Sequence, residues 1–149
     1  MLGMIYHSSE NYEKAAECYT LAVKKDKSKW IWSYYLGYLN KEMGLSAKFI
    51  ENFERLIVEN PKAYHAWYYM GEAYQNLGSN DKAAAAFKNI SSLKENNLRQ
   101  TSTMRKDYFP LAICAKYQLS RVYLDSGKLD LSNKTLQEIV GEYPTFGGA

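Results

Sequence analysis

The side chains of this sequence that could carry out acid–base or nucleophilic chemistry are few, with only two histidines and two cysteines. His7 and His65 have no histidine or carboxylate four residues away, the spacing that places a pair on one helix face. Cys18 and Cys114 lie far apart with no Cys-x-x-Cys motif, which argues against a zinc site and a disulfide framework. A glycine-rich phosphate loop after a strand is also absent from the sequence. We therefore expect a protein that is not an enzyme, with no metal and no cofactor.

Tyrosine is the residue type that stands out, with 14 copies against 3 Trp and 5 Phe in 149 residues. It combines a rigid apolar ring with a hydroxyl and loses little rotamer entropy on binding, so it is favoured at recognition surfaces. The aromatic composition therefore indicates binding rather than catalysis.

The bulk composition is that of a globular protein with a core, at 46% hydrophobic and 23% charged residues. The net charge of +3 is too small to indicate nucleic acid or an anionic membrane as a partner. The sequence contains no run of about 18 apolar residues and no signal-peptide pattern. We expect no membrane insertion, and the cysteine usage favours a cytoplasmic compartment.

The elements that must position the tyrosines are clearest in AWYYMGEAYQNLGSNDKAAAAF, residues 66–87. From Trp67 to Tyr74, apolar and small residues recur at i, i+3, i+4 and i+7, which predicts one helix face. A Gly-Ser-Asn break then predicts the end of this helix and the start of a second. Because glycine inside a helix costs about 1 kcal/mol relative to alanine, we expect Gly71 to lie where the second helix approaches, at Ala83.

This hairpin pattern repeats at a fixed period. A shift of about 34 residues moves Gly71 onto Gly37 and then onto Gly3. The same shift moves Phe87 onto Phe53. Further along the chain the period is interrupted by one insertion and then resumes. A period of this length is typical of stacked helical repeats, in which each unit buries its apolar face against its neighbours.

The pattern resembles the tetratricopeptide repeat family, whose unit is a pair of antiparallel helices in about 34 residues with W-x2-L-G-x2-Y, then A-x3-F, then P. The resemblance covers nearly the whole chain and implies an all-α fold, a right-handed superhelix of antiparallel helix pairs with about seven helices. We expect the chain to be a segment of a longer array. The implied organisation is a partial repeat at 1–29, repeats at 30–63, 64–97 and 110–146, an insertion at 98–109 and the stub of a further repeat at 147–149.

The resemblance also implies that positions 2, 5, 6, 9, 12 and 13 of each first helix point into a concave groove. A protein or peptide segment bound in this tyrosine-lined groove is the implied ligand, and the chain would act as an interaction scaffold. The alternative for any single tyrosine is packing between neighbouring repeats. The residues predicted to bind are Tyr34, Tyr35, Tyr38, Lys41, His65, Tyr68, Tyr69, Glu72, Asn76, Tyr117 and Arg121.

Two other classes of function stay open at this point. Stacking of the array ends on other copies would make the chain a self-assembly module and a homo-oligomer. Binding of single-stranded RNA would be supported by the basic residues of the insertion, Arg99, Arg105 and Lys106. The small net charge makes nucleic acid the less favoured partner of the two.

Overall fold

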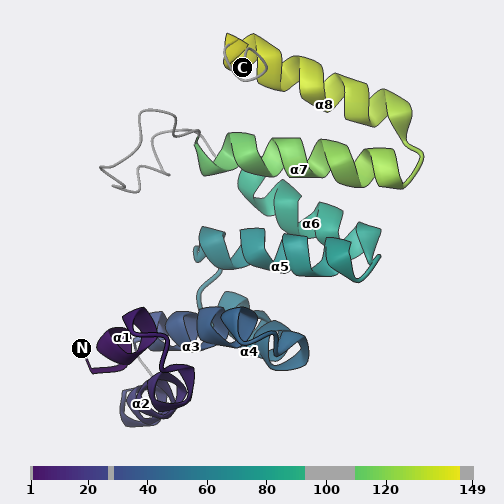
Figure 1. Ribbon diagram of the computed structural model, residues 1–149. Coiled ribbons are helices and arrows are strands. Elements are labelled where there is room, and N and C mark those ends of the chain that lie inside the picture. Colours follow the sequence, from purple (N-terminus) through teal and green to yellow (C-terminus); the bar gives the residue numbers. More distant parts are fainter. Residues whose placement is uncertain (1, 27–28, 93–109, 145–149) are drawn as a thin grey trace. The chain divides into compact units, whose positions relative to one another are not determined.

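A computed structural model describes residues 2–26, 29–92 and 110–144 (Figure 1). These residues contain eight α-helices and no strand, which confirms the all-α class. The number is eight rather than about seven because the partial first repeat contributes a helix pair in addition to the three full pairs. The helices are α1 (Leu2–Ser8), α2 (Tyr12–Lys25), α3 (Trp30–Glu42), α4 (Ser46–Glu59), α5 (Tyr64–Asn76), α6 (Asn80–Ser91), α7 (Leu111–Asp125) and α8 (Leu129–Glu142).

Several predicted features fall outside the described residues. The insertion at 98–109, with its basic cluster of Arg99, Arg105 and Lys106, is one of them. The stub at 147–149 is another. The boundaries proposed for the repeats stay a prediction.

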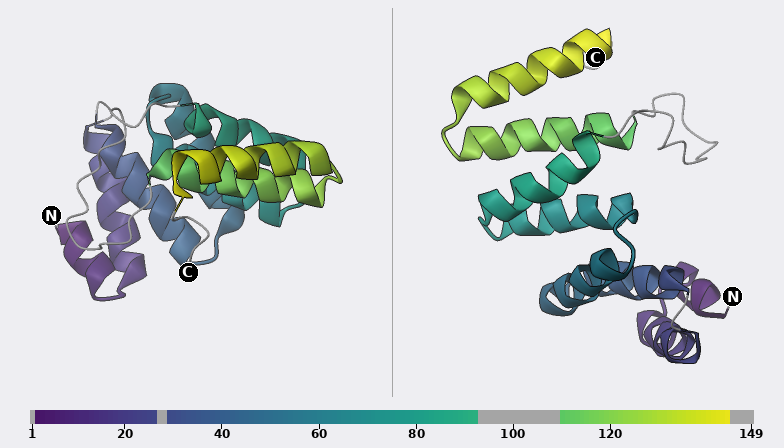
Figure 2. Two further views of the ribbon diagram at one scale, coloured as in Figure 1. Left: turned by 90° about the horizontal axis from the view of Figure 1, so that it is seen from above. Right: turned by 180° about the vertical axis from the view of Figure 1, so that it is seen from behind.

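Two compact units make up the chain, residues 1–66 and 67–149. The first unit contains α1 to α4 and the first turn of α5, and the second contains the rest of α5 with α6 to α8. Inside each unit, neighbouring helices pack as hairpins, α1 with α2, α3 with α4, and α7 with α8. Figures 1 and 2 show the α7 and α8 hairpin from several sides. The second helix of one hairpin also packs on the first helix of the next, α2 on α3 and α6 on α7.

Each first helix ends in the same left-handed turn. Gly44, Gly78 and Gly127 have φ angles of 70°, 70° and 72°. The residue after each of these glycines donates its N–H to the carbonyl five residues earlier, at 2.8 Å in all three cases. This Schellman arrangement satisfies carbonyl groups that the end of a helix leaves without partners. Glu10 holds the equivalent place after α1 with φ of 59°, which costs a residue with a Cβ about 1 kcal/mol.

Glycines on the first helices make room for aromatic rings on the second helices. A Cβ atom added at Gly71 would lie 2.6 Å from the ring of Phe87, and one at Gly37 would lie 2.2 Å from the ring of Phe53. Both phenylalanines are fully buried. The expected close approach at Gly71 is therefore present, but the atoms nearest to it belong to Phe87 rather than to Ala83.

In the hairpin of α7 and α8, other residues stand where the glycine and the aromatic ring meet in the earlier hairpins. Ser120 stands on α7 where the other first helices have glycine, and it is buried. The hydroxyl of Ser132 on α8 donates to the Ser120 carbonyl at 2.9 Å. The hydroxyl of Ser120 donates in turn to the Tyr117 carbonyl at 2.7 Å. Leu136 takes the position of the aromatic ring and is 36% exposed. A pair of small hydroxyl residues thus replaces the contact between glycine and ring.

Candidate functional site

In the first unit, two of the predicted tyrosines have clear packing roles. The ring of Tyr34 meets the edge of Phe53 at 5.7 Å between centroids and 62° between planes. The ring of Tyr35 stacks on Tyr19 of α2 at 5.7 Å and 19°. Both tyrosines are half-buried on α3. Tyr35 therefore packs between two neighbouring helix pairs, whereas Tyr34 packs within its own pair.

His7 on α1 lies among three tyrosine rings of the same unit. Its ring centroid is 5.9 Å from those of Tyr12 and Tyr38 and 6.1 Å from that of Tyr19. The Tyr19 hydroxyl and His7 Nδ1 are 3.4 Å apart. His7 was not among the predicted binding residues. The signal that points to it is its spacing, because it lies one repeat period before Lys41, which was predicted.

Tyr38 carries the polar groups of this face. Its hydroxyl donates to the Glu42 carboxylate one turn later. Burial raises the pKa of Tyr38 above its ordinary value, and the charge and hydrogen bond of Glu42 act in the same direction. The Lys41 ammonium lies 5.8 Å from the centroid of the Tyr38 ring, within the range of a cation–π contact. The α3 face therefore offers a carboxylate, an ammonium group and a phenol side by side.

In the second unit, hydrogen bonds join α5 to α7. Gln118 donates from Nε2 to the Tyr68 hydroxyl at 3.3 Å, and its Oε1 accepts from Arg121 Nη1 at 3.3 Å. Burial raises the pKa of Tyr68, and the bond from Gln118 opposes that shift. The ring of Tyr68 meets Phe87 at 5.7 Å and 71°, as Tyr34 meets its own phenylalanine in the first unit. Tyr68 is thus both packed and hydrogen-bonded.

A second bond of the same kind lies further along these helices. Gln75 Nε2 donates to Asp125 Oδ2 at 3.2 Å, between exposed side chains. Neither Gln75 nor Gln118 was among the predicted binding residues. Both occupy positions that the family pattern assigns to the groove, so the position rule alone could have found them.

The remaining predicted residues differ in exposure. Tyr117 on α7 is 41% exposed, and Arg121 on α7 and Asn76 on α5 are exposed as well. Tyr69 and Glu72 are half-buried, and the ring of Tyr69 lies 6.3 Å from that of Tyr68. The accessible part of this face is therefore built mainly by α7. His65 is half-buried in the first turn of α5.

Burial raises the pKa of the Cys114 thiol, which favours the neutral form over the nucleophilic thiolate. Among the described residues, no three His, Cys, Asp or Glu side chains lie together as a metal site. None of the helices in the described ranges has the length and apolar character needed to cross a membrane.

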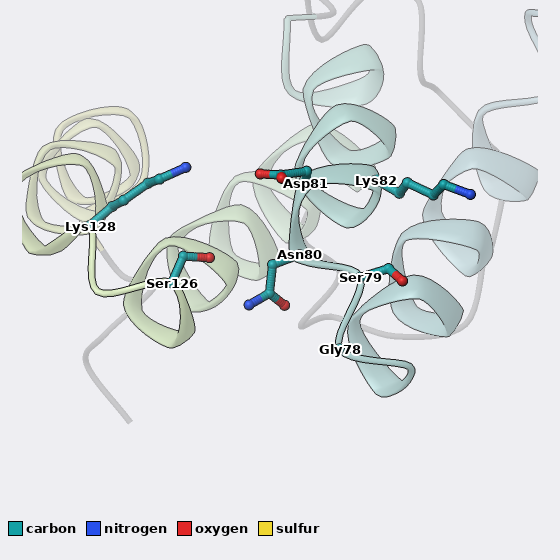
Figure 3. A pocket seen from close by; sticks show the side chains of 7 residues that line it. All are labelled: Gly78, Ser79, Asn80, Asp81, Lys82, Ser126 and Lys128. Atoms are coloured by element: carbon teal, nitrogen blue, oxygen red, sulfur yellow. The ribbon is translucent and has the colours of Figure 1, made fainter.

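A shallow hollow lies at the turns of the second unit (Figure 3). One side is formed by residues 78–82 at the start of α6, and the other by Ser126 and Lys128 before α8. Figure 3 shows that the Lys128 side chain extends toward the side of Asp81, that the Lys82 side chain extends away from it, and that the carboxylate of Asp81 lies between the two ammonium groups in this view. The hollow therefore has no concentration of positive charge that would attract an anion.

Comparisons with known proteins agree with this architecture. Three family models described as tetratricopeptide repeat match residues 1–28, 50–90 and 115–145. A search of curated proteins found no match.

Solved structures of similar fold include MamA, with a TM-score of 0.78 and 20% identity over 98% of this chain and 77% of that chain. A tetratricopeptide repeat protein from Parabacteroides merdae ATCC 43184 has a TM-score of 0.73 and 21% identity over 97% and 51% of the two chains. YrrB, described as a TPR protein with an unusual peptide-binding site, has a TM-score of 0.73 and 16% identity over 97% and 66%. At these identities the likeness concerns the fold. The matched residues, the paired helices and the repeated left-handed turns together show that this chain belongs to the tetratricopeptide repeat family.

Proposed function

We propose that this chain is a non-catalytic scaffold that binds a peptide or protein segment on its first helices, through α3 in the first unit and through α5 and α7 in the second. The fold is one used by protein-interaction scaffolds, which supports the general class. The finer assignment to these faces rests on the side chains that they carry. Each unit carries its own proposed binding face.

The observation that carries the proposal is the hydrogen-bonded set formed by Tyr68, Gln118 and Arg121. Hydroxyl, amide and guanidinium groups held in place by one another lose less entropy when they bind a ligand. A peptide backbone presents N–H and carbonyl groups that such side chains can bond. The guanidinium of Arg121 also has more donors than its single bond to Gln118 uses.

The apolar part of the ligand would lie on Tyr117. Its ring is exposed on the same helix as Gln118 and Arg121, one turn before Arg121. Tyrosine and arginine are enriched among the residues that dominate binding energy at protein interfaces. We therefore expect a peptide with an apolar or aromatic side chain, bound either in an extended form or as a short helix.

The α3 face of the first unit offers related chemistry. Tyr38, Lys41 and Glu42 place a ring and both signs of charge next to each other. His7 extends this face from α1. A segment with mixed charges and one aromatic residue would suit it.

The proposal can be tested without a known partner. Random-sequence peptides displayed on phage are selected against the immobilised chain, and the affinity of a selected, labelled peptide is measured by fluorescence anisotropy. Tyr117→Ala and Arg121→Ala should each weaken binding about tenfold, because residues of this type commonly contribute more than about 1 kcal/mol. The matched control is Lys134→Ala on α8, which is exposed and distant from the proposed groups in sequence. Equal affinity for all four proteins would refute the proposed face in the second unit.

Tyr68 needs a gentler change, because its ring packs on Phe87. Tyr68→Phe keeps that contact and removes only the hydroxyl that accepts from Gln118. A weaker affinity with unchanged helical content would show that the hydroxyl orients the binding groups.

A further inference from the structure

Two oppositely charged side chains on α7 lie one turn apart and do not pair with each other. Arg121 and Asp125 have the i, i+4 spacing at which opposite charges on a helix interact. The Arg121 guanidinium donates to Gln118 Oε1 at 3.3 Å, and the Asp125 carboxylate accepts from Gln75 Nε2 at 3.2 Å. Within the described part of the chain, neither charged group has an ion-pair partner.

Each of these two charges is held by a neutral amide. Gln118 donates to the Tyr68 hydroxyl on α5 at 3.3 Å, and Gln75 is itself a residue of α5, so both charged groups of α7 are tied to the neighbouring helix. Glu72 on α5 is also charged, but it is half-buried and acts on Tyr68, whose pKa it raises. A neutral partner orients a charged group without cancelling its charge. The face therefore keeps one positive and one negative group in fixed places, one turn apart.

The helix ends around Asp125 add to its negative charge. α5 ends at Asn76 and α7 ends at Asp125, and the bond from Gln75 shows that the two ends lie side by side. The carbonyl groups at a helix C-terminus carry partial negative charge and favour a nearby cation. Lys128, in the turn after α7, extends toward the side of Asp81 (Figure 3). The Asp125 end of the face is therefore suited to an ammonium or guanidinium group of a ligand.

The spacing along α7 fits an extended peptide. Tyr117, Arg121 and Asp125 are exposed and lie at i, i+4 and i+8, with a rise of about 6 Å between successive members. Alternate residues of an extended chain are about 6.6 Å apart and point to the same side. An extended chain also has main-chain groups without partners, which the second N–H of each amide, on Gln75 and Gln118, can bond. A helical ligand satisfies its own main-chain groups and would leave these donors unused.

We propose that the face formed by α5 and α7 binds an extended segment with an apolar, an acidic and a basic residue at alternate positions. In that order they lie on Tyr117, on Arg121 and on Asp125. The acidic side chain pairs with the guanidinium and the basic side chain pairs with the carboxylate. This assignment rests on the peptide-binding function proposed above and adds the charge order of the ligand. The segment runs in one chain direction or the other, and in both the acidic residue is central.

Four fluorescein-labelled synthetic peptides test the charge order by fluorescence anisotropy with the 149-residue chain. Two carry Leu-Ser-Glu-Ser-Lys or its reverse between glycine–serine flanks, and two carry Leu-Ser-Lys-Ser-Glu or its reverse. The better acid-centred peptide should bind about tenfold more tightly than either base-centred peptide, because exchanging the charges turns two attractive contacts into repulsive ones. Equal affinity of the two kinds, or no binding by any of the four, would overturn the proposed charge order.

A double-mutant cycle tests whether the basic residue meets Asp125. Asp125→Asn keeps an oxygen that accepts from Gln75 and removes the charge. It should weaken binding of the acid-centred peptide about fivefold, and it should leave unchanged the affinity of the same peptide with its Lys replaced by Gln. Arg121→Gln should have the corresponding effect at the peptide's Glu. The matched control is Asp130→Asn on α8, an exposed aspartate outside this face, which should bind like the wild type.

The charge order and the peptide-binding function can fail separately. If Tyr117→Ala weakens binding of a phage-selected peptide whereas Asp125→Asn and Arg121→Gln do not, the binding face stands and the charge order is wrong. If Asp125→Asn weakens the Lys peptide and the Gln peptide equally, the carboxylate acts on the protein and not on the ligand, which would also overturn the assignment. Circular dichroism checks that each variant keeps its helical content.

Discussion

The hairpin of α5 and α6 and the hairpin of α7 and α8 share a turn geometry but close on different atoms. In the first, Phe87 fills the space over Gly71 and is completely buried. In the second, Ser132 bonds to the backbone of Ser120, and the nearby Leu136 keeps a third of its surface exposed. The two hairpins show that a small residue at the point of closest approach is what the fold needs. The ring is one of several ways to complete the contact.

The hairpins also differ in how far the equivalent tyrosine of the first helix is exposed. Tyr34 and Tyr68 each lean on a phenylalanine of their own hairpin and are half-buried. Tyr117, whose hairpin has Leu136 in that place, is 41% exposed. The two tyrosines beside a buried phenylalanine are thus half-buried, and the tyrosine whose hairpin has leucine at that position is exposed.

The sharpest test of this comparison is to remove the side chain at the equivalent place in both hairpins. Phe87→Ala should lower the free energy of unfolding by about 4 kcal/mol, because a buried ring is lost and a cavity is left. Leu136→Ala should lower it by about 1 kcal/mol, since that side chain is already partly exposed. Urea unfolding followed by circular dichroism measures both values. Losses of equal size would contradict the contrast between the two hairpins.

A smaller loss of stability is expected when a methyl group is added at Gly71, beneath the ring of Phe87. Gly71→Ala should destabilise the protein by about 2 kcal/mol, because the new Cβ would lie 2.6 Å from Phe87. The better helix propensity of alanine offsets only a part of this. Gly141→Ala on α8 is the control, since nothing lies within 4 Å of its Cβ position, and it should stabilise by about 0.5 to 1 kcal/mol. Changes of the same sign at both glycines in thermal melts would show that steric contact is not decisive.

The left-handed turn predicts a stabilising substitution in the hairpin of α1 and α2. Glu10→Gly should stabilise the protein by about 1 kcal/mol, because φ of 59° is strained for glutamate and not for glycine. Gly44→Ala is the reciprocal change and should destabilise by a similar amount, although nothing lies within 4 Å of its Cβ. Chemical denaturation of both variants checks the pair. A loss of stability in Glu10→Gly would mean that its side chain contributes more than the strain costs.

The smallest effect concerns the Tyr68 hydroxyl and depends on pH. Burial raises the pKa of Tyr68, so the folded state holds this proton more tightly than the unfolded chain does. Its contribution to stability is therefore complete below the unfolded pKa of about 10 and is lost as the pH rises through the folded pKa. Tyr68→Phe should cost about 1 kcal/mol near neutral pH, through the lost bond to Gln118, and should make the alkaline decline shallower. Tyr19 and Tyr38, whose pKa values are also raised by burial, maintain the rest of the decline.

A decline of the same steepness in the wild type and in Tyr68→Phe would contradict this assignment. The measurement is the free energy of unfolding from urea titrations on both sides of about pH 10. The single substitution keeps the ring contact with Phe87, so the comparison isolates the hydroxyl.

Periodicity predicted the hairpins because it reports which residues share a helix face. It could not tell which of two residues on that face would reach the glycine, since Ala83 and Phe87 are one turn apart and lie on the same side of α6. The longer side chain, Phe87, is the one that reaches Gly71. The left-handed turn at Glu10 was hidden for a related reason, because its residue type opposes the conformation that the repeat imposes.

The candidate site could be predicted as a set of positions but not as a set of bonds. The family pattern placed Tyr68 and Arg121 on the first helices, whereas their joint partner Gln118 depends on side-chain rotamers that a sequence does not report. His7 was missed because the expected residues were taken from the full repeats only. Its contacts with Tyr38 show that the partial repeat contributes to the same face.

The left-handed turn that ends every first helix also has a consequence for the speed and order of folding. It brings two helices together across a short loop, so the entropy lost on closing each hairpin is small. Contacts between residues close in sequence are the kind that form fastest, and every hairpin holds its own set of them. Folding can therefore begin at whichever hairpin closes first and then spread to its neighbour, as α3 docks on α2 in the first unit and α7 docks on α6 in the second.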